Sequence, residues 1–201
     1  MLFSHIHQAL GQVRELRARI VAGQDFYGYS GIARGFGGLI ALGAGVLLSC
    51  SFYPRSITAH AIAWGLVCAF AVGINYSAML FWYLRHKSDS LTTLAPAAEA
   101  FPPLAVGALF TATLLYHGQE DLLFGTWMTL FGLTNLSSTR FLPPPIKPLG
   151  WFYIVSGGCC FFAREVSFTN PWPMAIVFAF GEIVGGIIFH QHRQSDEGAR
   201  S

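Results

Sequence analysis

Residues 171–190 have the sequence PWPMAIVFAFGEIVGGIIFH, an apolar stretch that opens with two prolines and contains one acidic residue, Glu182. A helix needs about 20 mostly apolar residues to cross the hydrocarbon core of a bilayer. Proline is tolerated in the first turn of a helix, so Pro171 and Pro173 are compatible with its start. The stretch therefore predicts a transmembrane helix with a carboxyl group inside the membrane.

Five stretches upstream have a similar apolar character, and proline or polar residues separate them. They cover about residues 36–53, 57–84, 101–116, 122–138 and 146–163. The chain has 201 residues, of which 53% are hydrophobic and 11% are charged, whereas soluble domains average about 25% charged residues. We therefore expect an all-α polytopic membrane protein with a bundle of six transmembrane helices. Segments 101–116 and 146–163 are short, so a re-entrant or half-membrane segment stays open for each of them.

The distribution of lysine and arginine predicts how the chain is oriented. With six spans, both termini and the even-numbered connections lie on one side. That side carries Arg14, Arg17, Arg19, Arg34, Arg85, Lys87, Arg140, Lys147, Arg193 and Arg200, and the other side carries Arg55 and Arg164. Basic residues accumulate on the cytoplasmic side of membrane proteins. We expect a multi-pass protein of the plasma (inner) membrane with both termini in the cytoplasm.

The first 33 residues are expected to form an interfacial helix and a connector. Apolar residues recur every three or four positions over residues 1–22, which predicts an amphipathic helix. Such a helix either lies on the cytoplasmic membrane surface or packs on cytoplasmic loops of the protein itself. Residues 34–190 would then form the transmembrane domain, and residues 191–201 a cytoplasmic tail.

No catalytic, metal or cofactor site is evident in the sequence. Cys50, Cys68, Cys159 and Cys160 form no metal-binding spacing. His60 and His117 fall on the outer side and could in principle bind one haem, but ordinary interfacial histidines are favoured. Catalytic motifs are also lacking, so we expect no enzyme and no cofactor. A net charge of +2 argues against a nucleic-acid partner, because such binding needs a basic face.

Glu182 is the residue on which a functional hypothesis can be based. At a helical rise of about 1.5 Å per residue it lies about 16 Å into its span, near the bilayer midplane. Since the spans place no lysine or arginine at that depth, we expect a carboxyl group that faces the bundle and is at least partly protonated. Asn75, Asn135 and Tyr153 lie at compatible depths in their spans. We predict that these three residues and Glu182 form a substrate-binding site; alternatively, Glu182 only cross-links helices.

Small residues predict where helices approach one another closely. Gly181 and Gly185 are spaced as in close-packing transmembrane helices, and Ala41 and Gly45 form a similar face on the first span. These faces could serve contacts within the chain, a homo-oligomer or another membrane protein. The lipid bilayer is the other expected partner.

Two functions are compatible with these features. Six spans in about 200 residues with both ends inside resemble the substrate-binding subunits of energy-coupling-factor vitamin transporters, in architecture and without a shared motif. The resemblance implies a small-solute transporter or a solute-binding membrane subunit. The alternative is a non-catalytic accessory or assembly membrane protein, which the amphipathic segment and the small-residue faces favour.

Overall fold

The computed structural model describes residues 31–86, 95–140, 143–163 and 166–200, and the regular structure in these residues is entirely helical. Its α-helices are α2 (Gly31–Ser49), α3 (Ile57–His86), α4 (Ala95–Tyr116), α5 (Leu123–Ser137), α6 (Ile146–Phe162) and α7 (Trp172–Arg200). Short 3₁₀ turns, η2 (Glu120–Leu122) and η3 (Ser138–Arg140), extend α5 at both ends. The predicted amphipathic helix over residues 1–22 lies outside the described residues.

Three of the helices are long and apolar enough to cross a membrane, which indicates a membrane-embedded protein. They are α2, the part of α3 from Ile57 to Ala78, and the part of α7 from Trp172 to His192. The apolar parts of α4 and α6 are shorter, at Phe101–Tyr116 and Ile146–Phe162. Helix α5 has 15 residues, which is below the roughly 20 that a span needs.

The boundaries of three helices differ clearly from those that the sequence predicts. Helix α2 (Gly31–Ser49) begins and ends earlier in the chain than the predicted span over residues 36–53. Helix α4 begins at Ala95, so Pro102 and Pro103 lie inside it and not in its first turn. Helix α7 continues past His190 to Arg200 and includes most of the predicted tail. Both extensions are rich in alanine, glutamate, glutamine or arginine, which favour helix even where the apolar pattern has ended.

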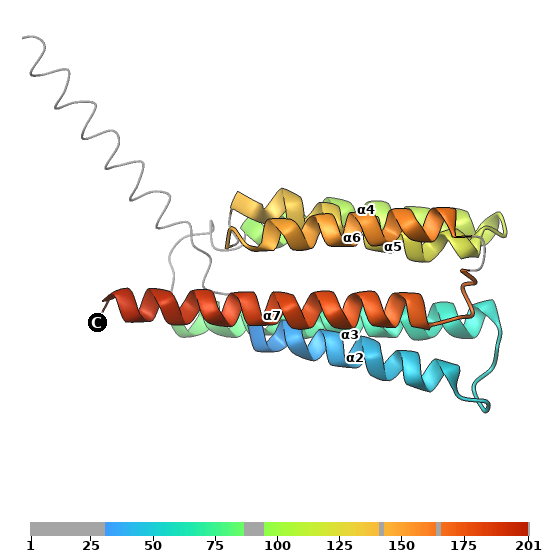
Figure 1. The fold of residues 1–201 in the computed structure, drawn as a ribbon, viewed down its shortest axis with the longest axis horizontal. Helices are drawn as coiled ribbons and strands as arrows, with labels where there is room; N and C mark the ends of the chain where they lie inside the picture. The colour runs from blue at the N-terminus through green and yellow to red at the C-terminus, as the bar shows by residue number, and fades with distance from the viewer. Residues whose placement is uncertain (1–30, 87–94, 141–142, 164–165, 201) are drawn as a thin grey trace, which may run out of the picture.

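The helices form two layers, as Figure 1 shows. Helix α2 packs against α7 and α3 in one layer, and α5 packs against α6 and α4 in the other. The layers meet mainly where α6 lies against α7, with a smaller contribution from α5. A residue on the inner side of α7 or α6 is therefore shielded by both layers.

Glycines allow α5 and α6 to approach each other closely. A Cβ atom at Gly157 would lie 2.7 Å from the carbonyl oxygen of Gly125, and one at Gly132 would lie 2.6 Å from the carbonyl oxygen of Gly150. Real Cβ atoms do not approach other atoms so closely. Two glycine pairs thus allow the backbones of α5 and α6 to lie in contact. Gly125 lies against Gly157, and Gly132 lies against Gly150.

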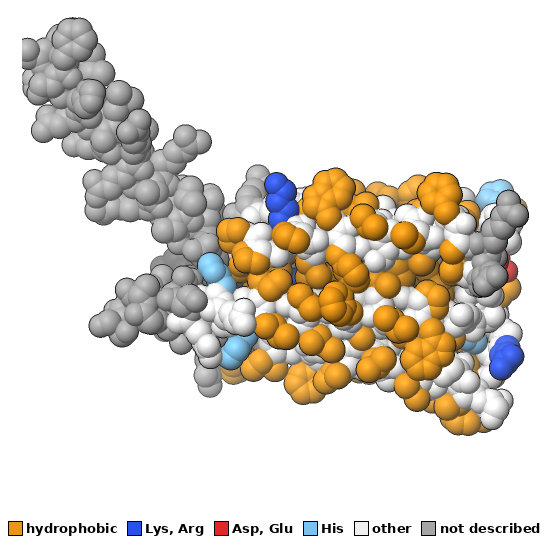
Figure 2. Space-filling view, viewed as in Figure 1, with side chains coloured by type: hydrophobic (Ala, Val, Ile, Leu, Met, Phe, Trp, Pro, Cys, Tyr) orange, Lys and Arg blue, Asp and Glu red, His pale blue; other side chains and the backbone are white. Residues whose placement is uncertain are grey.

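The surface has the character of a protein surrounded by lipid. In Figure 2, hydrophobic side chains cover the face between the two ends of the molecule, and the described charged and histidine side chains gather toward those ends. Large apolar side chains such as Phe70 on α3 and Leu109 on α4 are mostly exposed. Water would disfavour so much exposed apolar surface, whereas lipid accommodates it.

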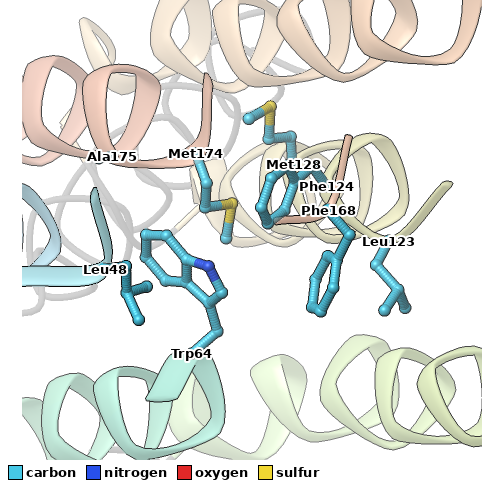
Figure 3. Packing of buried hydrophobic residues seen from close by; sticks show 8 residues of the cluster. All are labelled: Leu48, Trp64, Leu123, Phe124, Met128, Phe168, Met174 and Ala175. Atoms are coloured by element: carbon cyan, nitrogen blue, oxygen red, sulfur yellow. The ribbon is translucent and has the colours of Figure 1, made fainter. Parts of the chain in front are cut away.

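An apolar core joins the two layers at the end where α7 begins (Figure 3). It consists of Leu48, Trp64, Leu123, Phe124, Met128, Phe168, Met174 and Ala175. These residues come from α2, α3, α5, α7 and the connector before α7. At the same end, the Asp121 carboxylate accepts a hydrogen bond from the Phe168 backbone N–H at 2.7 Å, which fixes this connector to the turn before α5.

Candidate functional site

Glu182 lies on the side of α7 that faces the other helices, with 8% of its surface exposed. Glycines at positions 181 and 185 flank it on the same helix. A Cβ atom at Gly181 would collide with the hydroxyl group of Tyr153, and one at Gly185 would collide with the guanidinium group of Arg34. The two glycines therefore make room beside Glu182 for side chains from α6 and α2.

Arg34 is the direct charged partner of Glu182. Its Nη2 atom lies 3.0 Å from Glu182 Oε1 and its Nε atom lies 3.2 Å from the same oxygen, and the bonds are buried. The expectation of a neutral acid depended on the lack of a cation at this depth, and that premise is wrong. The structure shows an ion pair, because Arg34 lies in the first turn of α2 and its side chain reaches α7 across Gly185.

Asn135 and Tyr153 bring the second layer of helices into the same cluster. The Tyr153 hydroxyl donates a hydrogen bond to Glu182 Oε1 at 2.9 Å. Asn135 Oδ1 accepts a hydrogen bond from Arg34 Nη2 at 2.8 Å, while its Nδ2 donates to the Phe131 carbonyl at 2.9 Å. We call Arg34, Asn135, Tyr153 and Glu182 the interlayer cluster, because α2 and α7 supply two members and α5 and α6 the other two.

Two aromatic rings also lie near the guanidinium group. The Arg34 Cζ atom lies 6.0 Å from the centre of the Phe131 ring and 5.8 Å from that of the Phe189 ring. Cations are attracted to aromatic faces, more strongly where water is excluded. Arg34 is thus held by a carboxylate, an amide oxygen and two rings.

Asn75 is not part of the cluster. Its Nδ2 atom donates to the carbonyl oxygen of Ala71, one turn earlier on α3, at 2.9 Å. Helix α3 packs mainly on α2, and the side-chain hydrogen bond of Asn75 stays within α3. The structure therefore brings together three of the four residues that the sequence predicts and adds Arg34.

The two outer histidines have different surroundings. His60 is fully buried; its Nδ1 atom lies 3.1 Å from the Ser56 carbonyl and its ring contacts Tyr53 edge-on. His60 lies in the first turn of α3, where Tyr53 and Ser56 of the preceding connector contact it. His117 is exposed beside Tyr116. Within the described parts of the chain, no group of three or more His, Cys, Asp or Glu residues could hold a metal ion.

The small-residue faces are used inside the chain. Besides the positions next to Glu182, a Cβ atom at Gly45 would collide with the Cβ of Ala175, and Ala41 is 3% exposed. These faces hold α2, α6 and α7 together. A homo-oligomer or a membrane-protein partner would have to contact other surfaces.

Comparison with known proteins adds no relative. No family model, no curated protein and no solved structure matches this chain. The interlayer cluster is therefore the feature from which a function can be inferred.

Proposed function

We propose that the chain crosses the plasma (inner) membrane six times with both termini in the cytoplasm. Three of its helices support this by length and composition, and the 3₁₀ turns lengthen the short α5. The basic residues also support it. Arg34 is buried in an ion pair with Glu182, so we leave it out of the count, and the remaining count of nine against two still favours this orientation.

Reporter fusions test this topology. A reporter inserted at Glu120 and one fused to the C-terminus should report opposite sides of the membrane, because an odd number of spans separates them in the proposed arrangement. A reporter at Lys147 should agree with the C-terminus. Matching signals at Glu120 and at the C-terminus would contradict six spans.

For its activity, we propose a small-solute transporter or the solute-binding membrane subunit of one. The observation that carries this proposal is the buried interlayer cluster, in which charged groups of one layer contact polar groups of the other. Ionisable residues inside membranes are costly, and they commonly mark the path of an ion or solute. In transporters such sites lie between structural halves that move against each other.

A non-catalytic accessory or assembly protein is the second candidate. The span of α3 is the least buried of the three long apolar spans, and its large exposed side chains include Leu66 and Phe70. Such a face could contact another membrane protein as well as lipid. Under this alternative the interlayer cluster only fixes the two layers together.

A thermal-shift screen separates the two candidates. A solute that binds the native state raises the unfolding midpoint, by an amount equivalent to about 2.7 kcal/mol at 100 times its Kd. We expect at least one small solute to do so, and we expect Asn135→Ala to weaken the effect.

Asn75→Ala provides the matched control, since Asn75 and Asn135 donate the same hydrogen bond to the carbonyl one turn earlier. Its shift should equal that of the unmodified protein. A folded protein that responds to no solute, or a response equal in both variants, would contradict the proposed site.

A further inference from the structure

Three hydrogen bonds converge on one oxygen of the Glu182 carboxylate. Arg34 donates two of them, from Nε and Nη2, and the Tyr153 hydroxyl donates the third. Guanidinium groups recognise carboxylates through charge and through paired N–H donors, whichever molecule carries the carboxylate. The donors are therefore arranged as a carboxylate-binding site that the chain's own Glu182 occupies.

We propose that these donors bind a small monocarboxylate solute, which displaces the Glu182 carboxylate from Arg34 while Glu182 takes up one proton. This inference rests on the proposed transport function and names its solute class. In the exchange, the ion pair between Glu182 and Arg34 breaks and one between the solute and Arg34 forms. The proton binds to a Glu182 oxygen, so one anion and one proton enter together and the charge of the site is unchanged.

The charges around Glu182 explain why the proton is needed. Among the described residues, the titratable or charged groups that face it are Arg34 from α2 and Tyr153 from α6, while α5 contributes the neutral amide of Asn135. The positive charge of the Arg34 guanidinium group compensates the negative charge of the Glu182 carboxylate. A second carboxylate would leave an uncompensated negative charge in a buried place, which is strongly unfavourable.

Arg34 keeps contacts that do not depend on Glu182. Asn135 Oδ1 accepts from it at 2.8 Å, and the rings of Phe131 and Phe189 lie on it. Gly185 leaves the space in which the guanidinium group lies against α7. The cation thus remains in position when Glu182 becomes neutral and is ready to bind another anion.

The charge of the site also limits the solute. A dicarboxylate would bring two negative charges to a single guanidinium group, and only one of them would be compensated. The room beside Gly181 and Gly185 is already filled by Tyr153 and Arg34, so the carboxylate group of the solute takes the place of the Glu182 carboxylate beside Arg34. The single positive charge there favours a solute with one carboxylate group.

Calorimetric titration of the purified full-length protein in detergent tests this proposal. The probes are lactate, pyruvate and benzoate, with lactamide and benzamide as neutral counterparts and phosphate as another anion. Titrations are run at mildly acidic and mildly alkaline pH, in buffers of different ionisation enthalpy, so that proton uptake is counted. We expect a monocarboxylate to bind with uptake of one proton, and about tenfold more tightly for each pH unit by which the pH falls.

Variants assign the effect to the two charged groups. Glu182→Gln imitates the neutral acid, so it should bind the monocarboxylate with an affinity that no longer depends on pH. Arg34→Gln should lose binding. If that variant does not fold, the milder Tyr153→Phe is measured in its place, and it should weaken binding several-fold. Asn75→Ala should bind like the unmodified protein.

The possible failures are distinguishable. Binding without proton uptake, binding that survives in Arg34→Gln, or a pH dependence that persists in Glu182→Gln overturns the monocarboxylate proposal. If a neutral or cationic solute binds in an Asn135-dependent way and no monocarboxylate does, the transport function stands and the solute class is wrong. If no solute of any charge binds, both proposals are overturned.

Discussion

Glu182→Leu is expected to lower the free energy of unfolding by about 3–5 kcal/mol, because it removes the carboxylate from the buried ion pair with Arg34. Arg34 is 4% exposed and its side chain crosses α7 at a glycine, so it cannot move easily to water. The Tyr153 hydroxyl would also lose the acceptor that it now has at 2.9 Å. Denaturant unfolding in detergent micelles, followed by circular dichroism, measures the loss.

The double variant Arg34→Met with Glu182→Leu provides the control. Replacing both members of a buried ion pair with apolar groups of similar volume is often neutral or stabilising, so the double variant should regain most of the lost stability. Glu182→Gln should lie between the unmodified protein and Glu182→Leu, since an amide oxygen still accepts hydrogen bonds. If the double variant is as unstable as the sum of its two single variants, the two charges do not interact as the structure shows.

The sequence could predict Glu182 as the centre of a polar site because a carboxyl group at the bilayer midplane demands a partner. The sequence did not predict Arg34 as the partner of Glu182, because a basic residue next to the start of a span is ordinarily counted with the basic residues of the cytoplasmic side. A signal was nevertheless present. Arg34, Gly38, Ala41 and Gly45 recur every three or four residues, so Arg34 belongs to the small-residue face that packs on α7.

Asn75 and Asn135 show where prediction from one sequence ends. Both lie within apolar helices, and both donate to the carbonyl oxygen of the residue four positions earlier. Only the neighbours of their helices differ, since α5 lies against α6 and contacts α7 whereas α3 packs mainly on α2. Depth follows from counting residues along a span, but neighbours depend on how the helices assemble, which the apolar pattern of a membrane protein does not encode.

The helical class and most helix boundaries follow from the composition and the prolines, whereas the start of α4 and the end of α7 follow from local propensity. The predicted span over residues 146–163 agrees within a residue with α6 (Ile146–Phe162). The last predicted span ends at His190 because the apolar residues end there, yet α7 continues to Arg200. Hydropathy indicates where the chain leaves the hydrocarbon core, but a helix can continue into water when its residues favour helix.

The close contact between α5 and α6 predicts the second large effect, that of Gly157→Ala. The new Cβ atom would lie 2.7 Å from the Gly125 carbonyl oxygen and 3.0 Å from the Thr129 backbone nitrogen, and it would collide with the Thr129 hydroxyl oxygen. Two of these atoms belong to the backbone, so no side-chain rotation relieves the contact and the helices must separate. Overpacking of this kind costs about 1–3 kcal/mol.

The adjacent residue is the matched control, because a Cβ atom at Gly158 would meet nothing within 4 Å. Gly158→Ala should therefore be neutral or stabilise the protein by up to about 1 kcal/mol, through the better helix propensity of alanine. The difference between the two alanine variants isolates the effect of the helix contact, since the chemical change and the helix are the same. Because α5 carries Asn135 and α6 carries Tyr153, separation of these helices should also weaken solute binding at the interlayer cluster in Gly157→Ala and leave it intact in Gly158→Ala. Equal stability of the two variants would show that α5 and α6 do not lie as close as the glycine pairs require.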